Sequence, residues 1–136
     1  MHRTIRLAWL TIVLGLMAPP LMAERNLIPS LESILDVCSE RPNEPGWMEN
    51  IALRDAYQRV LVQDIYRAQN MERIVETGSC DCATRFPTWD KAEVNFRENH
   101  AGADRSEMLQ ASDGYNRHAN DIRPQAQAIC EAAGNW

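Results

Sequence analysis

Four cysteines constrain the fold of this chain more than any other feature of its sequence. They are Cys38, Cys80, Cys82 and Cys130. Four cysteines allow three pairings, and joining Cys80 to Cys82 would close a ring too small for ordinary disulfide geometry. Two pairings are left: Cys38 with Cys80 and Cys82 with Cys130, or Cys38 with Cys82 and Cys80 with Cys130. Either one ties the middle of the sequence to segments on both sides of it.

The N-terminal segment favours disulfides over free thiols, because it has the pattern of a secretory signal and exported proteins form disulfides. A basic start precedes an apolar run over residues 7–17, which is too short to span a bilayer as a stable helix. Two prolines follow, and Ala23 is a plausible cleavage point. Leu21 is larger than the small residue preferred there, so an uncleaved anchor is the alternative. We expect a signal peptide over residues 1–23 and one domain over residues 24–136, exported to a bacterial periplasm without a stable membrane span.

The charge of the chain argues against nucleic acid as a partner. Lys and Arg number 14 and Asp and Glu number 19, which gives a formal net charge of −5. Removing the predicted signal takes away two arginines and no acid, so the mature chain would be more acidic still. Phosphate backbones and anionic lipids repel such a chain. Protein partners are therefore expected.

Helical periodicity dominates the predicted mature chain, and no segment has the alternation that is typical of strands. We expect helices over residues 31–38, 47–76 and 89–99 and a last helical region over residues 105–133. Their expected N-caps include Ser30, Thr88 and Asp104, and Gly78 is the expected stop of the second helix. The predicted fold class is all-α: a small disulfide-stapled helical hairpin or bundle.

The two long segments each carry a narrow apolar stripe, so we expect them to pack against each other. Gly114 and Pro124 interrupt the second stripe, and Pro124 predicts either a kink in one helix or the start of a new one. The first stripe contains Tyr57, Leu61, Ile65, Ala68, Met71 or Glu72, and Val75, widened by Leu53 and Val60. The second contains Met108, Ser112, Tyr115, Ala119, Ile122, Ala126, Ile129 and Ala133.

No group of residues identifies a reaction, and we expect no catalytic residue, no cofactor and no metal. Two alternatives remain open. Glu93 and Glu98 are the kind of carboxylate pair that a small peptidoglycan-cleaving enzyme would need, although acids on helix faces are usually solvated. The Cys-x-Cys sequence is a candidate metal site with His100 or His118, or a redox pair, although it lacks the usual Cys-x-x-Cys spacing.

Three aromatic residues are the candidates for contacts with a partner, since large aromatic side chains anchor both cores and interfaces. Trp89 and Tyr115 lie in predicted helices and are equally suited to core packing. Trp136 follows Gly134 and cannot continue a helix. It must either fold back onto the core or contact a partner.

Two segments near the cysteines carry a resemblance to a group of exported proteins. They are Cys80-Asp81-Cys82 with Phe86-Pro87, Trp89 and Ala92 after it, and the run Ile129-Cys130-Glu131-Ala132-Ala133-Gly134-Asn135-Trp136. They resemble the small TraH-type proteins encoded with conjugative transfer systems of α-proteobacterial plasmids. The resemblance implies an accessory role in conjugal DNA transfer through a type IV secretion apparatus, acting in the periplasm by protein contacts and without a defined reaction. Components of that apparatus would be its partners.

Overall fold

The computed structural model describes residues 38–39 and 41–136, so the predicted signal peptide and nearly all of the predicted first helix lie outside the described residues. The described part of the chain is helical and contains no strand. This confirms the all-α class. The elements are α2 (Gly46–Glu49), the 3-10 helix η1 (Leu53–Asp55), α3 (Ala56–Thr77), α4 (Cys82–Arg85), α5 (Asp90–Asn99) and α6 (Arg105–Ala132).

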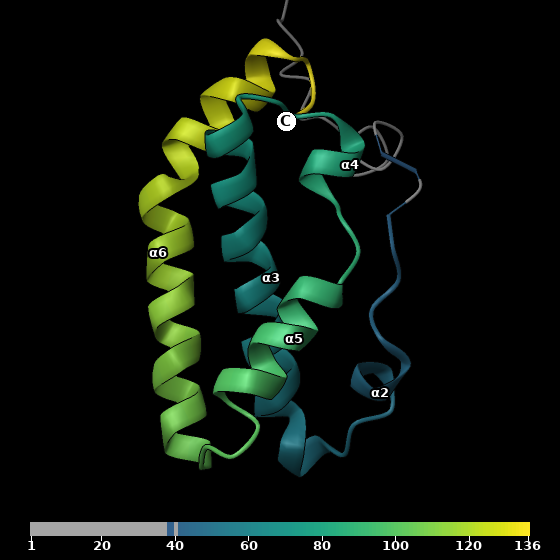
Figure 1. The fold of residues 1–136 in the computed structure, drawn as a ribbon, viewed down its shortest axis with the longest axis vertical. Coiled ribbons are helices and arrows are strands. Elements are labelled where there is room, and N and C mark those ends of the chain that lie inside the picture. The colour runs from purple at the N-terminus through teal and green to yellow at the C-terminus, as the bar shows by residue number, and fades with distance from the viewer. Residues whose placement is uncertain (1–37, 40) are drawn as a thin grey trace, which may run out of the picture.

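The two long helices, α3 and α6, lie side by side and run in the same direction (Figure 1). Their contacts keep a nearly constant spacing in sequence: Asp64 meets Ser112, Arg67 meets Asn116, and Glu72 meets His118. The chain returns between them through α4 and α5, which pack against α3. The fold is therefore a small bundle rather than a hairpin of two antiparallel helices.

The core consists of two clusters at opposite ends of α3. The first joins α3 to α2, α5 and the start of α6, and contains Met48, Leu61, Val62, Ile65, Ala92, Phe96 and Met108. The second lies at the cysteine end and contains Ile74, Cys80, Ala126 and Cys130. The second cluster is small, and two of its four buried residues are cysteines joined by a disulfide. The stability of this end of the bundle therefore depends on that covalent link.

The predicted single helix over residues 47–76 is wrong in its first part. The Asn50 side chain donates to the Gly46 carbonyl at 2.9 Å, and Ala52 is extended. Asparagine amides compete with the backbone for such bonds and interrupt helices. The predicted stripe itself is confirmed, since Leu61, Ile65 and Ala68 are buried, but the two residues expected to widen it are not: Leu53 is 92% exposed and Val60 is 45% exposed.

The ends of α3 and α5 test two of the predicted caps. Gly78 ends α3 with φ 65°, which confirms the predicted stop, since glycine adopts this left-handed conformation without strain. The predicted cap at Thr88 is wrong. Its hydroxyl donates to the Asp90 carboxylate at 2.9 Å, and Trp89 stands at the N-cap position of α5.

The last helical region is a single helix. Pro124 lies inside α6, and the last turns of α6 lean over the end of α3 (Figure 1). Gly114 also stays helical. Along the predicted stripe, the side chains of Met108, Ser112, Ala119 and Ala126 are buried and those of Tyr115, Ile122 and Ile129 partly so, whereas Ala133 is exposed.

Replacing Asp104 by alanine should lower the free energy of unfolding by about 1 kcal/mol. The predicted capping box is present: the Asp104 carboxylate accepts from the Glu107 N–H at 2.9 Å, and Glu107 accepts from the Asp104 N–H at 2.8 Å. Urea unfolding measures the change. Asp121→Ala, on the exposed face of the same helix, is the control and should change stability by less than about 0.5 kcal/mol. Equal losses in both variants would contradict the role of the cap.

Candidate functional site

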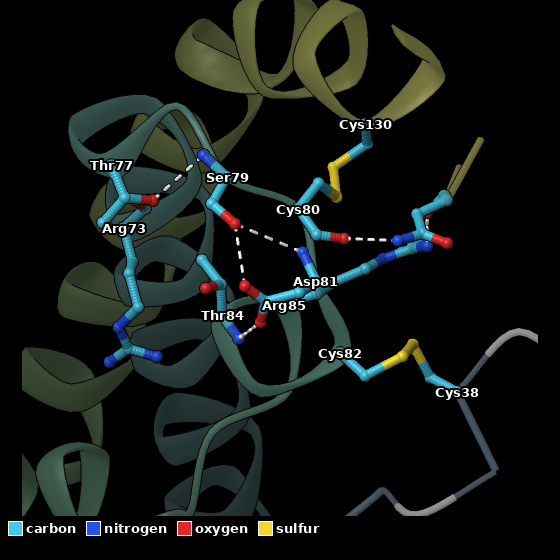
Figure 2. Close-up of a disulfide and its surroundings, with 11 residues drawn as sticks. Cys38, Arg73, Thr77, Ser79, Cys80, Asp81, Cys82, Thr84, Arg85 and Cys130 are labelled. Carbon is cyan, nitrogen blue, oxygen red and sulfur yellow. Dashed lines mark hydrogen bonds between the residues drawn. A yellow bond between two sulfur atoms is a disulfide. The ribbon is translucent and has the colours of Figure 1, made fainter. Parts of the chain in front are cut away.

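Two disulfides select one of the two pairings left open by the sequence. Cys38 is bonded to Cys82 and Cys80 to Cys130, with Cα atoms 5.5 Å and 5.0 Å apart (Figure 2). Both cysteines of the Cys-x-Cys sequence are thus engaged, each with a different partner, and neither is a thiolate ligand. Within residues 38–39 and 41–136, no group of three His, Cys, Asp or Glu side chains is placed to hold a metal ion.

The turn between α3 and α4 is ordered by short polar contacts, which Figure 2 shows around Asp81. The Ser79 hydroxyl donates to one Asp81 oxygen at 2.8 Å, and the Thr84 N–H donates to the other at 2.7 Å. The bonds from Thr84 and Ser79 lower the pKa of Asp81 because they favour the carboxylate. Asp81 thereby caps α4, which lies outside the helical segments expected from the sequence. α4 places Arg85 and Phe86 opposite α3.

These links enclose a cavity of about 270 Å³, which we call the arginine-aromatic pocket. One wall is a face of α3, the second is the end of α4, and the third is the C-terminal residue. The cavity is lined by Tyr66, Arg67, Asn70, Met71 and Ile74 of α3, by Arg85 and Phe86, and by Trp136. Among the described residues that line it, none is acidic.

The C-terminal wall is fixed by hydrogen bonds to the segment that carries the disulfides. Arg85 extends toward the C-terminal segment (Figure 2) and donates to the Asn135 carbonyl. The Asn135 side chain in turn donates to the Cys80 carbonyl at 2.7 Å. Trp136 consequently folds back against the second core cluster, with the Arg85 guanidinium 5.3 Å from its ring.

Arg67 and Arg85 line the pocket, and two further arginines lie against its aromatic rings; none of the four forms an ion pair with an acid in the described part of the chain. Arg67 is held by the amide oxygens of Asn116 and Asn120, which position its charge without neutralising it. The Arg41 guanidinium lies 4.0 Å from the centre of the Phe86 ring, and that of Arg123 lies 5.7 Å from the Trp136 ring. Of the other described arginines, Arg54, Arg59, Arg97 and Arg117 pair with acids, whereas Arg73 and Arg105 form no ion pair with a described acid.

Burial affects two polar groups of the pocket, the Arg85 guanidinium and the Asn70 amide. Burial and the nearby charge of Arg41 lower the pKa of Arg85, since both disfavour its positive form. The Asn70 side chain is only 7% exposed, and its Oδ1 atom, which is itself covered, has no hydrogen-bond partner among the described residues. Buried acceptors without partners are rare in folded proteins. The pocket is therefore lined by the guanidinium groups of Arg67 and Arg85, neither of which has an acidic partner among the described residues.

The other aromatic candidates lie elsewhere. Trp89 stacks on Tyr66 with ring centres 3.8 Å apart and donates to the Pro42 carbonyl at 3.3 Å. Tyr115 donates to Asn95 at 3.1 Å and meets the edge of His100. Both are partly buried in the first cluster, so of the three only Trp136 lines the pocket.

The two predicted carboxylates do not face one cleft. Glu93 accepts from the Trp47 indole at 2.9 Å and lies 3.9 Å from Arg97. Glu98 lines a different hollow on α5, beside Lys91. Glu93 and Glu98 therefore do not form the carboxylate pair considered in the sequence analysis. His118 contacts Glu72 at 2.7 Å and, with His100, lines a hollow over α6.

No pattern in the sequence pointed to Asn70, Arg67, Arg85 or Phe86 as site residues. They come from segments separated along the chain, and only the parallel packing of α3 and α6 and the cysteine pairing bring them together with Trp136. No local pattern in the sequence indicates that these residues lie next to Trp136.

Asn135→Ala should lower the free energy of unfolding by about 1 kcal/mol, because it removes the bond to the Cys80 carbonyl. It should also expose the Trp136 indole, which shifts tryptophan emission to longer wavelength. Urea unfolding followed by fluorescence measures both changes. The exposed loop residue Asn43 provides the control, since Asn43→Ala should change neither. An unchanged emission spectrum in Asn135→Ala would show that this bond does not hold Trp136.

Within the described residues, no helix combines the length and the apolar character that crossing a membrane requires. Comparisons of this chain with protein-family models, with curated proteins and with solved structures find no match.

Proposed function

We propose that this protein is an exported binding protein that acts in the bacterial periplasm by holding part of a partner protein in the arginine-aromatic pocket. One observation carries the proposal: two arginines line one cavity and two more lie against its aromatic rings, none of them with an acidic partner among the described residues, although the chain has a net charge of −5. An acidic protein that concentrates free positive charge in this way is suited to an anionic partner surface.

The composition of the pocket supports a protein partner. Tryptophan, tyrosine and arginine are the residue types enriched among those that dominate binding energy at protein interfaces. Here Trp136, Tyr66 and Arg85 line one cavity. Two guanidiniums, of Arg41 and Arg85, also lie within 4.0 Å and 5.1 Å of the same Phe86 ring. Their mutual repulsion is relieved when an anion binds between or beside them.

Different observations support the proposed compartment and the proposed partner. Two disulfides favour an oxidising compartment, and the signal-like residues 1–23 supply the route to it. The resemblance of residues 80–92 and 129–136 to TraH-type proteins makes a component of a conjugative type IV secretion apparatus the partner that we propose.

Site-specific photocrosslinking in the native host tests this function. A benzophenone side chain in place of Phe86 lines the pocket, whereas one in place of Val94 stands on the exposed face of α5. With the transfer apparatus assembled, we expect an adduct with an apparatus component from position 86 and none from position 94, and Arg85→Gln should abolish the adduct. Recovery of only the uncrosslinked monomer from position 86 would overturn the proposal.

A further inference from the structure

We propose that the arginine-aromatic pocket is the docking site of residues 24–37 of the same chain, the segment that directly precedes Cys38. These residues lie outside the described part of the structure. Three features of the described part point to them as the occupant: the position of one disulfide, the charge of the pocket and its apolar walls. The docking goes beyond the proposed function and does not depend on it, although a docked segment would compete with a partner for the same pocket.

The Cys38–Cys82 disulfide holds the end of this segment next to the pocket (Figure 2). The two Cα atoms are 5.5 Å apart, and Cys82 begins α4, the four-residue helix whose last residue is Arg85. Arg85 lines the pocket, and the Arg41 guanidinium lies 4.0 Å from the centre of the Phe86 ring, which lines it too. Residue 37 is therefore attached at a point that lies within one short helix of the pocket wall.

This attachment favours the segment over a free ligand with the same chemical groups. A ligand on a short link has an effective concentration in the millimolar range, whereas a free ligand must reach that concentration in solution. Residues 31–37 span about 10 Å as a helix and about 23 Å when extended. Both lengths exceed that of α4, which is about 6 Å for its four residues. The segment is therefore long enough to reach past α4 into the pocket.

The charge of the segment is opposite to that of the pocket. Its charged residues are three acids and one base: Glu24, Glu32, Asp36 and Arg25. Arg67 and Arg85 line the cavity and have no acidic partner among the described residues. Planar guanidinium groups bind carboxylates through paired hydrogen bonds. Docking therefore supplies carboxylates to two arginines for which no described residue does so.

The apolar side chains of the segment correspond to the apolar walls of the cavity. The helix expected over residues 31–38 has Leu31, Ile34 and Leu35 on one face. Glu32 and Asp36 are four residues apart and lie beside that face. The apolar part of the cavity lining includes Met71, Ile74, Phe86 and Trp136. One side of such a helix can thus place apolar side chains against these walls and carboxylates at the arginines.

A second hollow lies next to the same disulfide and lacks the charge that the segment requires. It is lined by Pro42, Cys82, Ala83, Phe86, Pro87 and Thr88. None of these described residues is charged, so docking there would leave the acids of the segment without basic partners. The arginines therefore distinguish the two positions.

Nuclear Overhauser contacts test the docking in the full oxidised protein. We expect contacts between the methyl groups of Leu31, Ile34 or Leu35 and the ring of Trp136. The absence of any contact between the segment and the pocket overturns the docking. Contacts of these methyl groups with Ala83 instead of Trp136 would place the segment in the second hollow and overturn the docking as well.

Two pairs of substitutions separate the carboxylates of the segment from general charge. Glu32→Gln combined with Asp36→Asn should abolish the methyl contacts, because it removes the groups that bind the arginines. Glu49→Gln combined with Glu98→Gln removes the same charge from exposed positions that do not line the pocket, and it should leave the contacts unchanged. Circular dichroism and the Tm of each variant show whether it is folded. Contacts that survive the first pair overturn recognition through the arginines.

Crosslinking from position 86 in the native host measures the competition between the segment and a partner. An occupied pocket lowers the apparent affinity for a partner by the fraction of open molecules, so Glu32→Gln with Asp36→Asn should raise the adduct yield at least about threefold. An unchanged or lower yield overturns the competition. Methyl contacts without any adduct keep the docking and overturn the proposed function, whereas an adduct without methyl contacts does the reverse.

Discussion

Replacing Cys80 and Cys130 together by alanine should lower the free energy of unfolding by about 4 kcal/mol, as the chain-entropy model gives for a loop of this length. The two cysteines are 50 residues apart in the sequence, and both are buried, at 2% and 0% exposed. They also form half of the second core cluster, so their loss removes packing at the end of the bundle that has least of it. Urea unfolding of the oxidised variant measures the change.

The other disulfide provides a matched control for this prediction. Cys38 and Cys82 are 44 residues apart, so replacing both by alanine removes a loop constraint of nearly the same length. Cys82 is exposed, however, and neither cysteine belongs to the second cluster. The Cys80 and Cys130 variant should therefore lose more stability than the Cys38 and Cys82 variant. A smaller loss, or one below about 1 kcal/mol, would contradict the role assigned to the buried disulfide.

Features that depend on a few neighbouring residues were predicted well from the sequence. The Asp104 and Glu107 capping box and the Gly78 stop each need only a residue type at a fixed offset, and both are present. The stripe of α6 was also predicted, since periodicity within one helix decides which residues share a face. All of these depend on local geometry alone.

The packing of α3 against α6 was predicted from their apolar stripes, but other features that depend on long-range packing were not. The choice between the two cysteine pairings depends on the directions in which Cys80, in the turn before α4, and Cys82, the first residue of α4, point, and spacing along the chain does not contain those directions. The pocket needs Asn70 and Trp136 to meet, which requires α3 and α6 to run parallel. Trp136 was singled out only because it follows a helix-ending glycine, and its partners were not found.

A pair of identical substitutions distinguishes the observed helix from the predicted one. Leu61→Ala should lower the free energy of unfolding by about 3 kcal/mol, the middle of the range for buried leucines, because the side chain is fully buried. It lies in the first cluster with Met48, Ile65 and Phe96, and its removal would leave a cavity among them. Denaturant unfolding of the oxidised protein gives the value.

Leu53→Ala removes the same atoms from a residue that the sequence pattern placed on the same stripe. Because the chain leaves the helix after Glu49 and re-enters it through η1, Leu53 is 92% exposed, and the substitution should change stability by less than about 0.5 kcal/mol. A continuous helix over residues 47–76 would instead bury part of Leu53 and make both substitutions costly. Comparable losses of stability from Leu53→Ala and Leu61→Ala would therefore contradict the break at Asn50. A large loss from Leu61→Ala alone would agree with a helix that begins after Leu53.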